Sequence, residues 1–174
     1  MHAIQLLRVM HSDAKMRFKL VLGVDDAAKA AEQWAALQPK LDLHERLEDE
    51  FLYTPLHAEM GPGTPLGDWD AIHEADVALV KQLIAASNKA PAGSPEWRML
   101  VGAINDALSK HVMAEEGQIF PRIEQVWGLE RLRKAGQAMQ ATIDRSAGAR
   151  PTPRSKDPVK TGSAATAAPA RRRR

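Results

Sequence analysis

The stretch His111-Val112-Met113-Ala114-Glu115 decides how this chain of 174 residues folds. A His and a Glu four residues apart lie on the same face of a helix, because each residue turns the helix by about 100°. The pair belongs to an apolar stripe at helical spacing in a predicted helix over 97–121, with Trp97, Leu100, Val101, Ile104, Leu108 and Ile119. The face that carries His111 and Glu115 should therefore be buried. A buried carboxylate without a partner is costly, and a metal cation is a suitable partner.

A second stretch repeats this spacing. The predicted helical segment over 26–56 carries His44 and Glu48 on its apolar face, and we expect it to be kinked or broken at Pro39. Glu45 lies beside the stripe and could also turn inward. The segment therefore offers one imidazole and one or two carboxylates to the interior.

Two further helices each place one histidine within an apolar stripe. The helix over 3–22 carries His11, and a helix that Asp68 caps and that ends near Asn88 carries His73. The predicted buried face of the latter helix comprises Trp69, Ile72, His73, Asp76, Val80, Leu83 and Ile84. Asp76 could be the hydrogen-bond partner of a metal-binding residue or a polar residue at the edge of this face, and we favour the edge.

The rest of the chain adds no candidate ligand. His57 and His2 lie off the stripes, and we expect both to be exposed. The Gly- and Pro-containing stretch 59–66 reads as a loop. After a short helical piece at 124–127, an amphipathic helix over 128–145 should pack against the outside of the other helices.

Composition agrees with an all-α protein. Helix formers dominate and runs of β-branched residues are absent, so we predict an up-down four-helix bundle with an extra C-terminal helix over 1–145. No cysteine is present, which excludes disulfides, thiolate metal sites and iron–sulfur clusters within this chain. No apolar run is long enough to span a membrane and the N-terminus lacks a secretory pattern, so we expect a cytoplasmic protein.

The last segment, 146–174, differs in composition. It is rich in Ala, Pro and Arg, has no apolar periodicity, and carries eight Lys or Arg against one Asp. This net of +7 leaves −5 for the rest of a chain whose total is +2. We predict a disordered basic tail. We expect no nucleic-acid partner beyond a weak contact that this tail could make, and we expect a monomer or a small oligomer.

In an antiparallel bundle the four histidines and the glutamates can meet in one layer. Imidazole with carboxylate suits iron, manganese or zinc and not copper(I). Six or seven such ligands exceed what one ion needs, whereas two six-coordinate ions, with an oxo or hydroxo bridge, would leave about one position for dioxygen, which suits iron. The alternative is a bundle with polar core residues, which must bury four His and two Glu at one depth without a cation.

The pattern His, His-x-x-x-Glu, His, His-x-x-x-Glu resembles the hemerythrin-like (HHE cation-binding) domain family over about 1–126, most specifically in the stretch from His111 to Pro121. The resemblance implies a non-haem di-iron centre in a four-helix bundle. It implies His11 and His44 on one iron, His73 and His111 on the other, and Glu48 and Glu115 as bridges. Glu45 matches an additional carboxylate of iron-sensing members.

Two positions depart from the oxygen-carrying hemerythrins. Val77 stands where these have a second His four residues after the third one, and Glu116 stands where they have Asp. The absence of cysteine also separates this chain from members linked to iron–sulfur cluster repair. The expected function is therefore binding of, or response to, dioxygen, peroxide or nitric oxide, as in oxygen binding or a stress response. Iron sensing or storage without turnover is the alternative, and a metal-free helical interaction protein is the third hypothesis. Whether the protein is an enzyme stays open.

Overall fold

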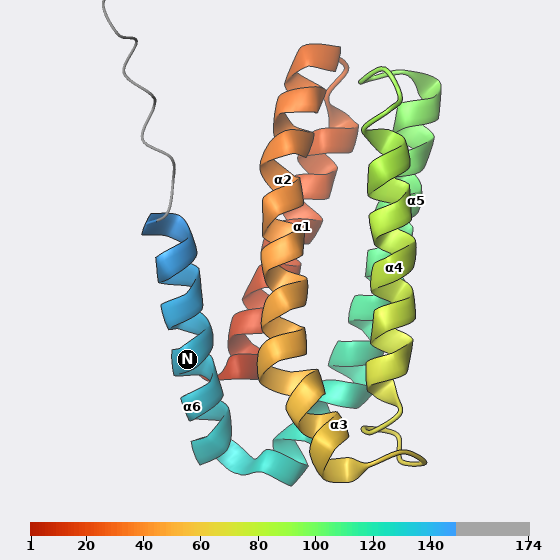
Figure 1. Cartoon of the computed structure of the whole chain (residues 1–174). Coiled ribbons are helices and arrows are strands. Elements are labelled where there is room, and N and C mark those ends of the chain that lie inside the picture. The colour runs from red at the N-terminus through yellow and green to blue at the C-terminus, as the bar shows by residue number, and fades with distance from the viewer. Residues whose placement is uncertain (149–174) are drawn as a thin grey trace, which may run out of the picture.

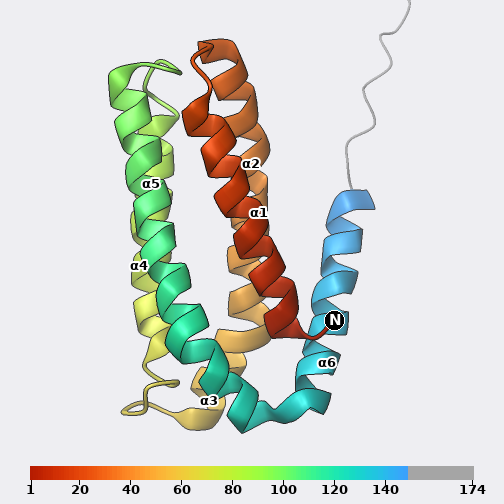
Figure 2. The same ribbon diagram turned by 180° about the vertical axis from the view of Figure 1, so that it is seen from behind.

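The computed structural model describes residues 1–148, which are helical and contain no strand. Four long helices run up, down, up and down side by side (Figures 1 and 2): α1 (Ala3–Gly23), α2 (Ala27–Glu48), α4 (Trp69–Ser87) and α5 (Pro95–Ala114). The predicted all-α bundle is confirmed. Within the described residues, every helix is too short or too polar to cross a membrane.

Shorter elements connect the long helices at one end of the bundle. The π-helical segment η1 (Asp49–Tyr53) and helix α3 (Thr54–Met60) follow α2, and the π-helical segment η2 (Glu115–Ile119) leads from α5 into α6 (Phe120–Gly148). The loop predicted from residue 59 therefore begins only after Met60. It also follows that the helix predicted as continuous over 97–121 changes its turn at Glu115.

The last helix, α6, consists of two pieces that meet at Gly128, as predicted. Gly128 has φ 66° and ψ 169°, a conformation that glycine adopts without strain. The first piece passes beneath the bundle and the second rises beside it, near the N-terminus (Figures 1 and 2). The helix reaches Gly148, so the first three residues of the tail predicted at 146–174 are helical. The other residues of that tail lie outside the described part of the chain.

Three polar residues precede helices as possible N-caps, and two of them cap the helix with their side chains. The side chains of Asp26 and Ser94 accept hydrogen bonds from the backbone N–H groups of Lys29 (2.9 Å) and Trp97 (3.1 Å), as N-caps do. Asp68 precedes α4 but accepts instead from Gly63 N, at 2.9 Å. Its carboxylate thus holds the preceding loop and leaves the helix end without a side-chain cap.

Of the kink or break expected at Pro39, the break does not occur. Helix α2 runs through Pro39 without interruption. Pro39 is exposed, so its ring lies on the solvent face, where the helix can lose one hydrogen bond and curve without disturbing the core. The irregular turn comes later, at η1.

Each π-helical segment begins at, or directly after, a buried glutamate. Segment η1 follows Glu48, and η2 starts with Glu115. Ile123 follows His111 by twelve residues, and in a regular α-helix the two side chains would point about 120° apart. A π-turn accommodates one extra residue, which reduces this angle to about 20°. Both residues are buried. The π-turn therefore keeps the buried stripe in phase beyond Glu115.

The apolar interior consists of two clusters. One lies toward the turn between α1 and α2 and includes Phe18, Trp34, Leu37, Trp97, Val101 and Ile104. The other lies toward α3 and α6 and includes Ile4, Leu7, Leu52, Leu56, Phe120, Ile123 and Leu132. Along the chain, residues of one cluster precede each of His11, His44, His73 and His111, and residues of the other cluster follow it, so the polar layer lies between the two clusters.

Helix α6 extends the second cluster. Leu132 and Met139 are buried against the start of α1, and a Cβ on Gly136 would come within 2.8 Å of the backbone of Met1 to Ala3. One residue differs from expectation: Ile72, predicted to be buried on α4, is 50% exposed. Ile72 precedes the buried His73 by one position, which turns it toward solvent.

Candidate metal centre

Six of the seven predicted ligands come together from four sides of the bundle. They form two groups whose ligand atoms lie within 4.8 Å of one another: His11, His44, Glu48 and Glu115, and Glu48, His73, His111 and Glu115. Glu48 and Glu115 belong to both groups. Two adjacent positions for a cation thus share two carboxylates.

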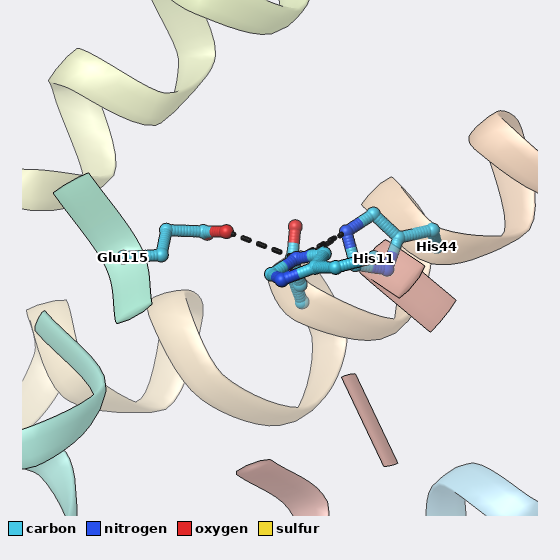
Figure 3. A group of neighbouring side chains, drawn as sticks. His11, His44 and Glu115 are labelled. Atoms are coloured by element: carbon cyan, nitrogen blue, oxygen red, sulfur yellow. Dashed lines mark hydrogen bonds and ion pairs between the residues drawn. The ribbon is translucent and has the colours of Figure 1, made fainter. Parts of the chain in front are cut away.

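In the first group, one atom of His11 lies close to the three other residues. His11 Nε2 lies 3.1 Å from His44 Nε2, 3.2 Å from Glu115 Oε2 and 3.6 Å from Glu48 Oε1. His44 Nε2 lies 3.2 Å from the same Glu48 oxygen. Figure 3 shows His11, His44 and Glu115 pointing toward one another from α1, α2 and η2. The Nε2 atoms of both histidines therefore face the interior.

The second group lies on the other side of Glu115. His111 Nε2 is 3.0 Å from Glu115 Oε1 and 3.4 Å from His73 Nδ1. Glu115 thus faces His11 with Oε2 and His111 with Oε1. A carboxylate in this orientation can bridge two cations.

Five of the six residues are buried, and the His44 side chain is 15% exposed. Glu115 is 0% exposed, Glu48 1% and His73 3%. Glu48 Oε1, Glu115 Oε2 and His73 Nε2 have no hydrogen-bond partner, although His44 and His11 lie at ion-pairing distance from the two carboxylate oxygens. Unpartnered polar atoms are costly in an apolar interior, and carboxylates and imidazoles are cation ligands. The residues present therefore fit a metal.

Without a metal, protons take its place. Burial alone would lower the pKa of His11, but the close, negatively charged carboxylates of Glu115 and Glu48 raise that pKa to about 10. The pKa of His111 rises to about 9 against the same effect of burial, through Glu115, the charge of Glu48 and the hydrogen bond with Asp76. Burial lowers the pKa of His73. Two imidazolium ions thus balance the two buried carboxylates in the metal-free protein.

Two outer carboxylates orient the histidines. His111 Nδ1 lies 2.9 Å from Asp76 Oδ2, and His11 Nδ1 lies 2.8 Å from Glu116 Oε1. Asp76, for which we favoured an edge position, lies at the edge with its side chain 45% exposed and is also the hydrogen-bond partner of a candidate ligand. An imidazole that donates its Nδ1–H to a carboxylate presents Nε2 to a cation in a fixed tautomer.

Aromatic rings enclose the layer. The Tyr53 hydroxyl donates a hydrogen bond to Glu115 Oε1, and its ring centroid lies 4.6 Å from that of His73. Burial and the charges of Glu115 and Glu48 raise the pKa of Tyr53 well above its ordinary value. Trp69 stacks on His111 at 5.7 Å, and Phe120 stacks on His11 at 5.8 Å. The sequence pattern did not identify Tyr53 as a contact of the site. Its position five residues after Glu48 was the available signal.

The remaining candidate, Glu45, does not join either group. Its carboxylate pairs with Lys81 Nζ at 2.9 Å, at the edge of the bundle. Its role as a ligand stays a prediction. His57 is exposed, as expected, and its Nδ1 lies 3.0 Å from Gly67 O, whereas His2 is partly buried at the start of α1.

A cavity of about 50 Å³ adjoins the layer. His44, Glu48, His73 and His111 line one side of it, and its other walls are mainly apolar, with Leu41, Val77, Val80, Ile84, Ala107 and Leu108. One water needs about 10–15 Å³ of such space, so the cavity has room for a small molecule beside the histidines.

Comparison with known proteins gives one match. The family model described as hemerythrin HHE cation binding domain matches residues 2–125, which include all seven predicted ligands. No curated protein and no solved structure gives a significant match.

Proposed function

This chain belongs to the hemerythrin HHE cation-binding domain family, and we propose that it binds two iron ions and that small oxidants (dioxygen, peroxide or nitric oxide) bind or react at them. The observation that carries the proposal is the pair of four-residue groups that share Glu48 and Glu115. A single cation bound in one group would leave two of the six ligand residues unused. Two cations between the shared carboxylates would use all six.

The ligand types are compatible with iron, and the proposed reaction with small oxidants selects iron among the candidate metals. Four imidazoles and two carboxylates suit iron, manganese and zinc. When bound, iron would supply reversible one-electron chemistry and a coordination position for a small ligand. The fold's own contribution is orientation and exclusion of water: Asp76 and Glu116 hold two imidazoles, and Tyr53 holds Glu115.

The apolar cavity supports a small ligand. It lies against His44, His73 and His111, and Val77 contributes an apolar wall at the position that holds a histidine in the oxygen carriers. Its volume of about 50 Å³ suits a molecule of two or three heavy atoms better than an organic substrate.

The experiment is metal analysis of protein purified without added metal, with absorbance spectra of the reduced protein before and after exposure to air. We expect two iron ions per chain and a new charge-transfer band after air. Iron without a spectral response would favour the sensing or storage alternative. An absence of bound metal would refute the proposal in favour of the metal-free interaction protein.

The site assignment has its own test. The His111→Ala variant should lose at least half of the bound iron and melt at a lower temperature, because Glu115 would lose both its imidazole partner on that side and the metal. His57→Ala is the matched control, because His57 is exposed and outside both groups. Unchanged iron content and melting temperature in His111→Ala would show that the assignment is wrong.

The sensing alternative predicts metal-dependent folding. A ligand that binds only the folded state stabilises it by mass action, so an iron sensor should loosen strongly when iron is removed. Limited proteolysis of the metal-free and loaded forms distinguishes an iron sensor from a protein that stays folded without iron. Similar digestion rates for both forms would argue against a sensor whose signal is its own unfolding.

A further inference from the structure

The inner cavity lies close to the surface between α2 and α4. A groove of about 270 Å³ runs over these two helices and is lined by Glu45, Asp49, His73, Glu74, Val77, Ala78 and Lys81. Four of these residues also line the inner cavity: Glu45, His73, Val77 and Lys81. The groove and the cavity are therefore separated by little more than these four side chains.

One ion pair spans this boundary. Glu45 on α2 and Lys81 on α4 approach to 2.9 Å, with side chains 28% and 57% exposed. Elsewhere α2 packs mainly on α1, and α4 packs mainly on α5. The Glu45–Lys81 pair is thus a principal contact between α2 and α4 at the depth of the polar layer.

We propose that the Glu45–Lys81 pair closes the entrance through which small molecules reach the candidate metal centre, and that Glu45 acts there and not as a ligand. Ion pairs between exposed side chains are weak and are screened by salt, so this pair can open without any movement of the helices. The entrance opens onto His73 and the apolar cavity, and a small uncharged molecule can then reach the layer.

A second groove, of about 330 Å³ between α1 and α5, also borders the layer. The residues it shares with the inner cavity are Leu41, His44, Leu108 and His111. These are candidate ligands and interior side chains. Passage there would require displacing them, whereas Glu45 and Lys81 can swing into solvent.

The proposal rests on the proposed metal site, and its test measures how fast iron leaves the ferrous-loaded protein. The uncharged chelator 2,2′-bipyridine is too large for the cavity of about 50 Å³ and traps the ferrous ion once it has left through the entrance. Glu45→Gln and Lys81→Met should each keep two iron ions and release them about two- to fivefold faster, the range expected for losing an exposed ion pair. The exchanged pair, Glu45→Lys with Lys81→Glu, should return the rate to that of the unaltered protein. Lys134→Met, which breaks an exposed pair with Glu130 of the same 2.9 Å length, is the control.

Added salt separates the entrance from a general loosening. It should speed release from the unaltered protein and leave Lys81→Met unaffected, because the variant has no pair to screen. Unchanged rates in both single variants would overturn the proposal and place the entrance elsewhere. Loss of iron in Glu45→Gln and in the exchanged pair would make Glu45 a ligand and would also overturn the proposal.

A second readout does not need a metal. In the metal-free protein, diethyl pyrocarbonate should modify His73 faster in both single variants, as followed by peptide mass spectrometry. The exposed His57 serves as an internal reference whose rate stays constant. If the unaltered protein binds no iron, the proposed function fails, while modification of His73 still decides whether the Glu45–Lys81 pair controls access.

Discussion

Asp76 and Glu116 each hold an imidazole of the layer from its outer side. Both carboxylates are partly exposed, with side-chain exposures of 45% and 40%, yet each contacts a histidine that is only 6% exposed. Each carboxylate holds a proton on Nδ1 of its histidine and orients the ring, so that Nε2 of His111 or His11 faces the interior. Exposed residues thus determine the orientation of buried ones.

Asp76→Asn should weaken metal binding by about 10- to 100-fold, because an amide cannot replace the carboxylate that holds His111. A competition titration against a chelator of known affinity measures this. Asp106→Asn is the control, because Asp106 lines the same surface groove on α4 and α5 as Asp76. Equal affinities for both variants would mean that the contact does not orient the ligand.

The histidine pKa values give a pH prediction for the metal-free protein. His11 and His111 have pKa values of about 10 and about 9 in the fold, against 6.5 for an unperturbed histidine. A pKa raised on folding stabilises the fold fully below pH 6.5, and this contribution is lost as the pH rises through 9 and 10. The melting temperature of the metal-free protein should therefore fall over that alkaline range.

The loaded protein should behave differently, because metal ligation already removes these protons. Its melting temperature should change less over the same range. Thermal melts of both forms between neutral pH and pH 10 make the comparison. Parallel curves would show that the two histidines do not exchange protons for metal.

At the scale of elements, the π-helical segments position both shared carboxylates. Glu48 is the last residue of α2 before η1, and Glu115 is the first residue of η2. Each wider turn changes the direction of the backbone just where a carboxylate must reach the layer. Such turns are frequent at functional sites because they insert one residue without breaking the helix.

Deleting Gly117 should convert η2 into regular α-helical turns. The apolar stripe beyond it would remain in phase, because the deletion removes the extra residue, so helix content should persist. Metal content should fall, since Glu115 would lose its present orientation. Circular dichroism and metal analysis measure the two effects.

Gly117→Ala is the control for that deletion. Nothing lies within 4 Å of a Cβ at this position, so the variant should keep its metal and gain about 0.5–1 kcal/mol of stability from the helix preference of alanine. Full metal content after the deletion would show that the π-turn is not needed to place Glu115.

At the scale of the whole molecule, the polar layer joins two apolar clusters that would otherwise pack separately. All six converging residues and both clusters lie within residues 1–148. Helix α6 contributes Leu132 and Met139 to one cluster and is tied to α3 by the Arg131–Glu59 ion pair. The second half of α6 is therefore part of the bundle's core.

A chain that ends at Gly148 should keep the iron content and melting temperature of the full chain, because it retains every ligand and both clusters. Metal analysis and a thermal melt test this. A shorter chain that ends at Gly128 is the contrasting variant, and it should be destabilised because it removes Leu132 and Met139 from the core. A metal-free chain ending at Gly148 would overturn the domain boundary.

Periodicity in the sequence was sufficient to predict the helices and the residues that meet between them. His11, His44, His73 and His111 lie on apolar stripes, and a stripe at helical spacing can be buried on only one side. The same rule failed where the helix departs from regular α-helical geometry. It did not predict the π-turns, because a single extra residue alters the phase of a stripe without any distinctive residue type.

Only the tertiary structure decided which partners the polar groups have. The contacts of Asp76 with His111, Glu116 with His11, and Glu45 with Lys81 join residues that lie 35, 105 and 36 positions apart in the sequence. Spacing along one helix determines which way a side chain points. It therefore predicts that histidines and glutamates form a layer inside the bundle. What each group meets there depends on the depth and rotation of the neighbouring helix, which packing alone fixes.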